Sequence, residues 1–399
     1  MPPNQWRVLD GRNSKSNPVG RKICATENEC DNLRVNEQRP AGIQMQLPLT
    51  SCCELMSQKE CSDEETYKYN RKKSQSKDYG AEASQALLNL IRDRPGFMMK
   101  PASAAAVLLG AIGACAQSSD LFIRLMTYNI RWATPTPGTN EALWSVRRPR
   151  LTAQLNYETA GRPESLVCMQ EVVEEQLLGI AEDLGSSWSH IGVSRDDGVA
   201  AGEFSPIFYQ PGAWDLVENR TYWLSETPDV AGSVGWDAAL PRIVTVASFT
   251  HVGSGFPLVF MCTHFDHVGQ TARENSAALL VDLAKEWESA ADEVTPVFLG
   301  GDLNIEPDNP AYQTLIAEGN MHDTLDVTPE AHRVGYSKTY TGFTVDESDD
   351  SLIDHLFVRD PNARGMEFLT HAVLPNKFDD GLYISDHRPV VTDVKFGAA

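Results

Sequence analysis

The chain has 399 residues, of which 42% are apolar, so it is long enough for two domains of ordinary size or one large domain with extensions. Its net charge of −21 is unevenly spread, because residues 117–399 hold 18 Lys and Arg against 42 Asp and Glu. Proteins that track nucleic acid usually present a basic stripe, since neutralising phosphates supplies most of their affinity. The acidic part therefore argues against a long polyanionic substrate, without excluding a local basic patch.

Residues 1–97 are polar and show no sustained period of 2 or 3.6, which predicts a disordered extension rather than a folded domain. We interpret them as a gene-model artefact, with translation starting at Met98 or Met99. The alternative is a translated disordered region that is followed by a buried Ala-rich helix.

Residues 98–116 have the layout of a secretory signal peptide, with a Met start, the basic Lys100, an apolar stretch and small residues before Gln117. The apolar stretch of 15 residues is shorter than the roughly 20 that cross a bilayer. We therefore expect no stable membrane insertion and a secreted product that begins at Gln117. Lipid attachment at Cys115 is the minor alternative.

After Gln117, apolar strand-like runs alternate with helical and loop segments. Many of the runs are apolar on both faces, which is typical of buried sheets covered by helices. Predicted helices cover residues 174–184, 271–290 and 310–318. Predicted strands cover residues 121–127, 165–170, 206–209, 242–249, 257–263, 295–299, 352–358 and 389–394.

The acidic part contains two cysteines, Cys168 and Cys262, and both fall inside apolar strand-like runs. Cysteine is among the most often buried residues, so two buried free thiols are the expected state. A disulfide between them is the alternative in an oxidising compartment.

Several apolar strands end abruptly in a polar residue that a buried strand would not hold. Asn129 follows one run, Glu171 a second and His264 a third, while Asp302 and Asn304 follow a fourth. Polar groups at strand ends can converge on one rim, where open α/β sheets hold ligands.

The full set of candidate site residues is rich in carboxylates, which repel one another and resist joint ionisation. A hard divalent cation relieves that repulsion, and oxygen ligands suit Mg²⁺, Mn²⁺ or Ca²⁺ rather than Zn²⁺. Taken singly, each residue has an ordinary explanation, such as a turn cap or an exposed strand position. The candidates are Asn129, Glu171, Glu203, His264, Asp302, Asn304, Asp354, Asp386 and His387.

Taken together and in order, the motifs resemble those of the endonuclease/exonuclease/phosphatase (deoxyribonuclease-I-like) superfamily, over essentially all of residues 120–396. Residues 223–228 and 235–242 further resemble a microbial secreted branch of it. The resemblance implies an α/β fold, a four-layer α/β/β/α sandwich of two packed mixed β-sheets flanked by helices. The motifs that carry it are Thr127-Tyr-Asn-Ile130, Gln170-Glu171, Gly202-Glu-Phe-Ser-Pro-Ile-Phe-Tyr209, Thr263-His-Phe-Asp-His267, Gly300-Gly-Asp-Leu-Asn304, Ile353-Asp-His355 and Ser385-Asp-His-Arg-Pro389.

The resemblance also implies roles for the carboxylates and amides. Glu171 would be the chief metal ligand, with Asn129 and Asp386 beside it. Asp302 and Asn304 would position or deprotonate the attacking water. The implied cofactor is Mg²⁺ or Mn²⁺.

For the two imidazoles, the resemblance implies contact with the phosphoryl group and a supply of protons. Glu203 would orient His264, and Asp354 would orient His387, because a carboxylate behind an imidazole fixes its tautomer and raises its basicity.

Two arginines, Arg242 and Arg273, would meet a second phosphate or a charged leaving group in the same comparison. Either arginine is equally compatible with a surface ion pair. Asp266 and His267 would border the site without an assigned function.

These observations predict a phosphate-ester hydrolase in residues 117–399, acting as a monomer on a small soluble or lipid-derived phosphomonoester or phosphodiester. One alternative is a nuclease, either a 3′-to-5′ exoribonuclease or a DNase-like endonuclease, for which the motifs are equally suited. Another is a binding protein that keeps the fold without turnover, which the intact set of acids, amides and imidazoles disfavours.

Overall fold

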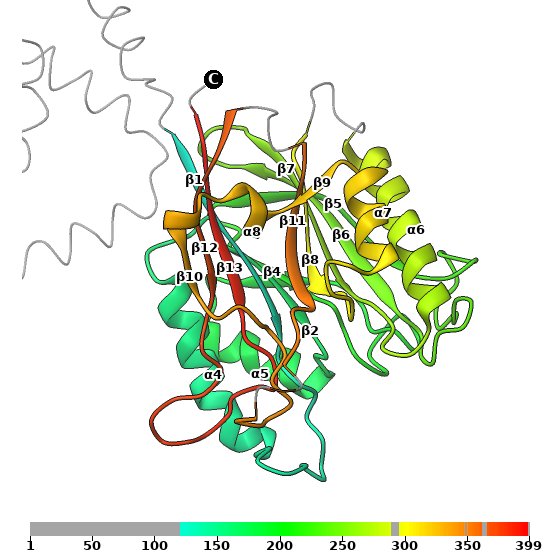
Figure 1. The fold of residues 1–399 in the computed structure, drawn as a ribbon. Helices are drawn as coiled ribbons and strands as arrows, with labels where there is room; N and C mark the ends of the chain where they lie inside the picture. The colour runs from blue at the N-terminus through cyan, green and yellow to red at the C-terminus, as the bar shows by residue number, and fades with distance from the viewer. Residues whose placement is uncertain (1–119, 289–294, 347, 349, 361–364, 398–399) are drawn as a thin grey trace, which may run out of the picture. The chain divides into compact units, whose positions relative to one another are not determined.

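Two packed β-sheets form the centre of the computed structural model, which describes residues 120–288, 295–346, 348, 350–360 and 365–397. Their elements are shown in Figure 1. The predicted extension over residues 1–97 and the predicted signal peptide over residues 98–116 lie outside the described residues.

The first sheet has seven strands in the order β10-β12-β13-β1-β2-β4-β3. It is mixed, since β1 runs parallel to β2 but antiparallel to β13. Its strands are β1 (Leu121–Asn129), β2 (Leu166–Gln170), β3 (Ser189–Ile191), β4 (Ile207–Tyr209), β10 (Arg333–Gly335), β12 (Met366–Val373) and β13 (Val390–Phe396).

The second sheet has six strands in the order β5-β6-β7-β8-β11-β9. It is also mixed, because β7 and β8 are parallel and the other neighbours are antiparallel. Its strands are β5 (Trp214–Trp223), β6 (Ile243–His251), β7 (Pro257–His264), β8 (Val297–Asp302), β9 (Met321–Asp323) and β11 (Asp354–Arg359).

Helices cover the outer face of each sheet, which gives the predicted four layers. On the first sheet they are α4 (Trp144–Thr159) and α5 (Glu174–Leu184), and on the second they are α6 (Gln270–Glu288) and α7 (Pro310–Ala317). Figure 1 shows α6 and α7 side by side along the second sheet. Two short elements, α8 (Thr324–Val327) and the 3₁₀ helix η3 (Glu330–His332), connect β9 to β10.

The burial of β1 shows why its sequence is apolar on both faces. Ile123 and Leu125 join the cluster between the sheets, whereas Met126 and Tyr128 join the cluster under α4 and α5. A strand packed on both sides needs apolar residues in both orientations. The two-sided strands of the prediction are confirmed for this reason.

Some elements have no strong apolar pattern and were not predicted. The buried face of α4 includes Arg147, Gln154 and Thr159, and Pro149 lies inside the helix. Strand β5 is exposed over much of its length.

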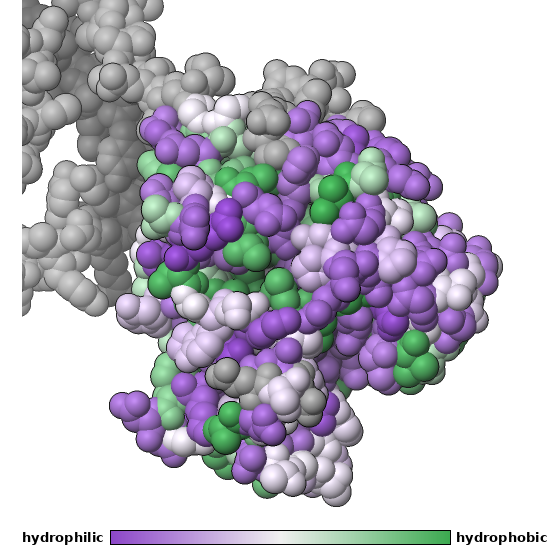
Figure 2. Space-filling view, in the orientation of Figure 1, coloured by the Kyte–Doolittle hydropathy of each residue, from purple (hydrophilic) through white to green (hydrophobic). Residues whose placement is uncertain are grey.

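Figure 2 shows that the surface over the described residues on this face is largely hydrophilic. Among the described helices, none combines the length and the apolar character needed to span a bilayer.

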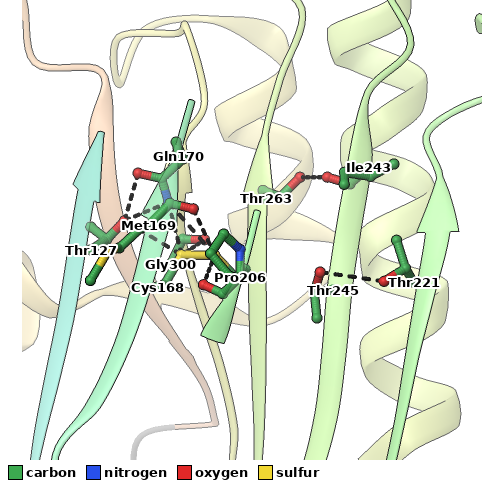
Figure 3. Close-up of a disulfide and its surroundings, with 11 residues drawn as sticks. Thr127, Cys168, Met169, Gln170, Pro206, Thr221, Ile243, Thr245, Thr263 and Gly300 are labelled. Atoms are coloured by element: carbon green, nitrogen blue, oxygen red, sulfur yellow. Dashed lines mark hydrogen bonds between the residues drawn. A yellow bond between two sulfur atoms is a disulfide. The ribbon is translucent and has the colours of Figure 1, made fainter. Parts of the chain in front are cut away.

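The two cysteines of the acidic part are joined in a disulfide, so the expectation of free thiols was wrong. Cys168 on β2 and Cys262 on β7 face each other across the space between the sheets, with their Cα atoms 5.3 Å apart (Figure 3). Both are completely buried. The sequence placed each cysteine in an apolar strand-like run, but only the packing of the sheets shows that the two face each other.

Removal of this crosslink by the double change Cys168→Ala and Cys262→Ala is expected to lower the free energy of unfolding by about 2–5 kcal/mol. The crosslink closes a segment with a sequence separation of 94, which restricts the unfolded chain. Equilibrium unfolding in urea measures the change. A non-reducing peptide map that recovers Cys168 and Cys262 in separate, unlinked peptides would contradict the crosslink itself.

Candidate active site

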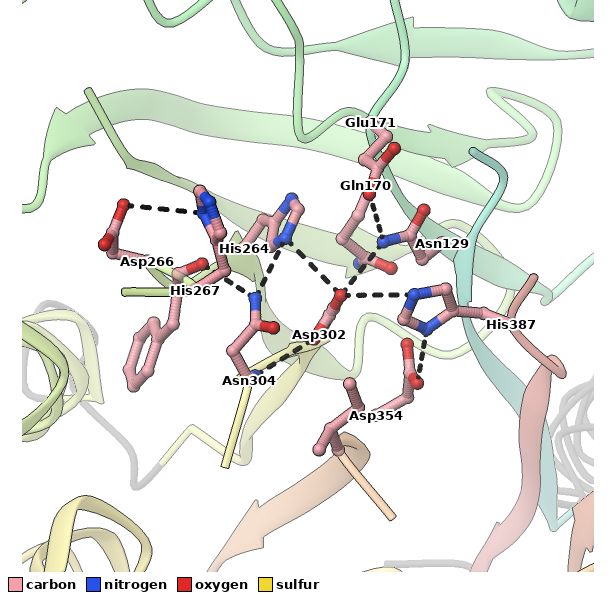
Figure 4. Close-up of polar contacts among 12 residues, drawn as sticks. Asn129, Gln170, Glu171, His264, Asp266, His267, Asp302, Asn304, Asp354 and His387 are labelled. Atoms are coloured by element: carbon pink, nitrogen blue, oxygen red, sulfur yellow. Dashed lines mark hydrogen bonds and ion pairs between the residues drawn. The ribbon is translucent and has the colours of Figure 1, made fainter. Parts of the chain in front are cut away.

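The candidate side chains converge where strands of both sheets end, as the sequence predicts. Asn129 and Gln170 are paired at the ends of β1 and β2, and His264 is paired with Asp302 at the ends of β7 and β8. Asp354 opens β11 opposite Asp302. Figure 4 shows these groups pointing toward one another from their strands.

A hydrogen bond between the two sheets joins the halves of the site. Asn129 Nδ2 donates to Asp302 Oδ2 at 2.9 Å and to Glu171 Oε1 at 3.0 Å. The close approach of β7 and β8 beneath the site requires glycine at Gly301, because a Cβ there would lie 2.5 Å from the carbonyl oxygen of Thr263.

Two site residues have a left-handed backbone conformation, which residues other than glycine rarely adopt. Glu171 has φ of 60° and Asn304 has φ of 50°. Each stands just after a strand end, where the sharp turn brings its side chain into the site. Such conformations cost on the order of 1–3 kcal/mol and persist where the surroundings enforce them, which is common at functional sites.

Glu171 lies on the side of the site that the sequence assigns to the metal. Its Oε2 accepts a hydrogen bond from the Trp132 backbone at 3.1 Å and lies 3.8 Å from Arg131 Nη1. Burial opposes ionisation of Glu171, but His387, Asn129 and Arg131 outweigh it and hold its pKa below the ordinary value. Glu171 is therefore available as an anionic ligand.

The other carboxylates are crowded and poorly solvated. Burial raises the pKa of Asp386, and the Glu171 carboxylate adds to the rise. Burial, followed by Asp354, raises the pKa of Asp302 to about 7. A divalent cation would relieve both effects, and the oxygen donors present suit Mg²⁺ or Mn²⁺.

The donor set on the Glu171 side thus fits such an ion, and the predicted ligands Glu171, Asn129 and Asp386 all belong to the site. Asp302, Asp354 and His387 also present ligand atoms within 4.8 Å of one another, the one such group among the described residues. Asp354 already engages His387 Nδ1, so this group is not assigned the ion.

His387 has the carboxylate partner that the sequence predicts. Its Nδ1 lies 2.8 Å from Asp354 Oδ2, and its Nε2 lies 3.7 Å from Asp302 Oδ2. Burial alone would lower the pKa of His387, but Asp354 and Asp302 outweigh it and hold this pKa well above the ordinary value. The ring is packed edge-on against Tyr340. His387 is therefore charged and can donate a proton from Nε2.

His264 does not have its predicted partner. Its Nε2 lies 3.2 Å from Asn304 Nδ2 and 3.4 Å from Asp302 Oδ2, while the Glu203 carboxylate binds Arg195 at 2.6 Å. The prediction that Glu203 orients His264 directly was wrong, because the Arg195 amide donates to the Glu203 carbonyl and this backbone pairing brings the two side chains together. Burial, with Arg242 and Arg195 nearby, holds the pKa of His264 well below its ordinary value, so the ring is neutral.

The structure separates the two arginines that the sequence assigned to the substrate. Arg242 lines the active-site cavity, but Arg273 is not among its lining residues. Arg273 lies in the first turn of α6, and its guanidinium instead donates to the backbone oxygen of Asp266 at 2.9 Å and to Gln270 Oε1 at 2.8 Å. Asp266 accepts three backbone N–H groups, and His267 borders the cavity as expected.

The cavity has a volume of about 610 Å³ and includes residues that the sequence did not indicate. Arg131 and Trp132 follow the Asn129 motif directly and Ile353 precedes Asp354 in its motif, so adjacency was an available signal for these three. For the others, no sequence pattern points to the site. The lining residues not predicted are Arg131, Trp132, Arg195, Leu240, Tyr340, Ser351 and Ile353.

A further unpredicted residue, Arg147 of α4, supports the backbone on the metal side of the site. Its guanidinium is fully buried and donates to the carbonyl oxygens of Ile130, Arg131, Trp132, Ala142 and Ile384. These contacts tie the segment after β1 to the segment before Asp386. Arg147 therefore positions backbone rather than contacting the cavity.

Comparisons with known proteins agree with this geometry. The model of the endonuclease/exonuclease/phosphatase family matches residues 126–387. A search of the curated proteins found no match.

Among solved structures, a protein of that family from Bacteroides thetaiotaomicron is 30% identical, with a TM-score of 0.63 over 70% of this chain and 99% of the other. A second, from Bacteroides vulgatus, is 32% identical, with a TM-score of 0.62 over 69% and 100%. The mannosyl-6-phosphatase of Bacteroides thetaiotaomicron VPI-5482 is 31% identical, with a TM-score of 0.60 over 68% and 99%.

Proposed function

Because the chain belongs to the endonuclease/exonuclease/phosphatase family, we propose that it is a hydrolase of phosphate esters that depends on Mg²⁺ or Mn²⁺. The observation that carries the proposal is the place of Asp302. Its Oδ2 accepts a hydrogen bond from Asn129 and lies 3.4 Å from His264 Nε2 and 3.7 Å from His387 Nε2. A phosphoryl group that reaches Asp302 in the cavity therefore meets both imidazoles.

In this mechanism Asp302 and Asn304 position the attacking water, and Asp302 accepts its proton. Asp302 is buried, and its Oδ2 lies beside the Nε2 atoms of both imidazoles, where a carboxylate can serve as general base. His387 carries a proton on Nε2 and delivers it to the leaving oxygen, while Asp354 holds the ring. The neutral His264 holds the phosphoryl group from the other side.

Glu171, Asn129 and Asp386 would hold the metal ion. When bound, such an ion polarises a phosphoryl oxygen and offsets the charge that develops during the reaction.

For the substrate, we propose a small phosphomonoester. The acidity of residues 117–399 disfavours a long polyanion, and the cavity has the size of a small-molecule site. The similarity to a mannosyl-6-phosphatase supports the same class. A nuclease is the second candidate, because Trp132 is 36% exposed in the cavity wall, where a base can stack.

We further propose that the protein acts outside the cell, after removal of the predicted signal peptide over residues 98–116. A buried disulfide is typical of proteins that fold in oxidising compartments, which supports this location.

A substrate screen tests the activity. Purified protein with Mg²⁺ or Mn²⁺ is incubated with hexose phosphates, phosphodiesters, single-stranded DNA and RNA, and kcat/KM is compared. We expect the highest kcat/KM with a phosphomonoester and loss of activity in EDTA. Higher values for DNA or RNA would favour the nuclease, and no release of product from any substrate would contradict the proposal.

A further inference from the structure

The disulfide between Cys168 and Cys262 lies between the two sheets, next to the active site. Along a β-strand, residues two positions apart point to the same face and are about 7 Å apart. Cys262 therefore shares a face of β7 with His264, and Cys168 shares a face of β2 with Gln170, the residue before Glu171. Each half of the crosslink is thus a short step along its strand from a side chain of the site.

The neighbouring strands add two residues, and we call Thr127, Cys168, Cys262 and Gly300 together the disulfide layer. Thr127 pairs with Cys168 in the first sheet, and Gly300 pairs with Cys262 in the second. Across the sheets, the Gly300 carbonyl oxygen lies 3.2 Å from Cys168 Sγ. Figure 3 shows Thr127 and Gly300 beside Cys168. The disulfide layer therefore sets how closely the two sheets approach at this point.

The two sheets carry different parts of the proposed machinery. Two residues after each member of the disulfide layer, a strand ends at the active site, at Asn129, Gln170, His264 and Asp302. Asn129 and Glu171, which would hold the metal ion, adjoin the first sheet, whereas His264 and Asp302, which would hold the phosphoryl group and the attacking water, belong to the second. A misplacement of about 1 Å can cost about 100-fold in rate. The spacing of the sheets at the disulfide layer therefore bears directly on turnover.

We propose that Cys168 and Cys262 are positioning residues for catalysis, whose disulfide fixes the metal-binding side of the site against the side that holds the attacking water. This inference rests on the proposed phosphate-ester hydrolysis and adds a covalent link between the two halves of its site. Because Glu171, Asn129 and Asp386 all adjoin strands of the first sheet, the crosslink governs turnover and leaves metal affinity nearly unchanged.

Reduction tests the proposal while every side chain stays in place. The protein is unfolded in urea with dithiothreitol, which transfers two electrons and two protons to the disulfide as it closes to its own cyclic disulfide. It is then refolded with the reductant present, and the reductant is removed under nitrogen. With a phosphomonoester and saturating Mg²⁺, kcat is expected to fall by about 10- to 100-fold, and reoxidation should restore it. The Kd for Mn²⁺, measured by calorimetry, should change by less than about threefold.

The double variant Cys168→Ala, Cys262→Ala makes the same test by mutation and controls for the reductant. Its kcat should match that of the reduced protein. The reduction cycle should not change this kcat further, because all other cysteines precede residue 117.

Gly300→Ala disturbs the disulfide layer while the crosslink stays intact, and it decides the question if the reduced protein does not refold. A Cβ at Gly300 would lie 3.1 Å from Leu356 Cδ2, 3.3 Å from Thr127 Cβ and 3.4 Å from Cys168 Cβ, so its neighbours must give by a few tenths of an ångström. We expect kcat to fall by about 3- to 10-fold while the Kd for Mn²⁺ stays unchanged.

Leu280→Ala is the matched control for a general loss of stability. Leu280 is fully buried where α6 packs on the outer face of the second sheet, so its truncation leaves a cavity away from the disulfide layer. This variant should unfold at lower urea concentration and keep kcat within about threefold of the unchanged protein.

A folded, reduced protein with unchanged kcat would overturn the positioning role. So would equal losses of kcat in the reduced protein and in Leu280→Ala, because the effect would then come from lost stability. A loss of Mn²⁺ affinity as large as the loss of kcat would overturn it too, since the crosslink would then shape the metal site itself.

The absence of any phosphate-ester hydrolysis by the oxidised protein would instead refute the proposed function. Binding of inorganic phosphate in the presence of Mn²⁺, followed by calorimetry, then decides the positioning role without turnover. The anion would contact both sides of the site, so reduction should weaken its binding by at least about tenfold. Equal phosphate affinities of the oxidised and reduced proteins would overturn the role of the crosslink.

Discussion

Replacement of His387 by alanine is expected to lower kcat by about 10²- to 10⁴-fold, the usual share of one positioned general acid or base. His387 is held charged in a buried site, with its Nδ1 on Asp354 and its Nε2 facing Asp302. Its removal deletes the proton donor to the leaving oxygen. Steady-state kinetics with a phosphomonoester and saturating Mg²⁺ measures the loss.

Asp354 acts through His387, so the two residues should behave as one unit. Asp354→Asn keeps the shape of the side chain but removes the negative charge that orients the His387 ring and favours its protonated form. It is expected to cost much of what His387→Ala costs, and the double change little more than His387→Ala alone, because effects within one catalytic unit are not additive. Strict additivity of the two losses would refute the pairing.

The chain contains a matched control for this cycle. His355 Nδ1 lies 2.7 Å from Asp323 Oδ2 in a second buried pair, and neither residue lines the active-site cavity. Asp323→Asn should therefore lower stability, as the loss of any buried charged partner does, with little effect on kcat of the folded protein. A comparable fall in kcat for both aspartates would show that the kinetic effect comes from general loss of structure.

The second large effect is expected at Glu171, where the change to glutamine removes charge but keeps shape. Glu171 is buried in a left-handed conformation and bonded to Asn129, and its pKa is held below the ordinary value. Loss of a residue behind a metal ligand typically costs about 10- to 100-fold in metal affinity, so loss of the chief ligand should cost at least about 100-fold. Activity should fall correspondingly at low Mg²⁺ concentration.

Mn²⁺ titration followed by calorimetry measures the affinity, and circular dichroism checks the fold. Glu141→Gln is the control, because Glu141 is also buried and binds Arg131 Nε at 2.9 Å, yet it does not line the cavity. This variant should keep its Mn²⁺ affinity. An unchanged Mg²⁺ dependence in Glu171→Gln would remove Glu171 from the role of metal ligand.

The sequence by itself identified the elements whose surroundings are uniform along their length. Strands β7 and β8 and the second half of β1 are apolar on both faces because they are buried on both faces, and this pattern is visible without a structure. The same pattern makes Asn129, His264 and Asp302 recognisable in the sequence, because each is a polar residue at the end of an apolar strand. The pairing of His264 with Asp302 was predictable because parallel strands end at one edge, whereas Asn129 reaches Asp302 from the other sheet, and only the packing of the two sheets decides that contact.

Elements with mixed surroundings escaped prediction. Helix α4 places Arg147 and Gln154 on its buried face, so its polar and apolar residues do not separate into two faces. Strand β12 and most of β5 are partly exposed, and their residues carry little apolar periodicity. For such segments the environment of each residue is set by its neighbours in space, and a local pattern does not record it.

Only the tertiary structure decided which side chains form pairs. Cys168 and Cys262 form a disulfide because β2 and β7 face each other between the two sheets. Glu203 binds Arg195 and not His264, because the backbone of Arg195 pairs with that of Glu203. Both contacts depend on how separate strands are placed side by side. The sequence determines the period and chemistry of each strand, whereas partner choice follows from packing between strands that are distant in the chain.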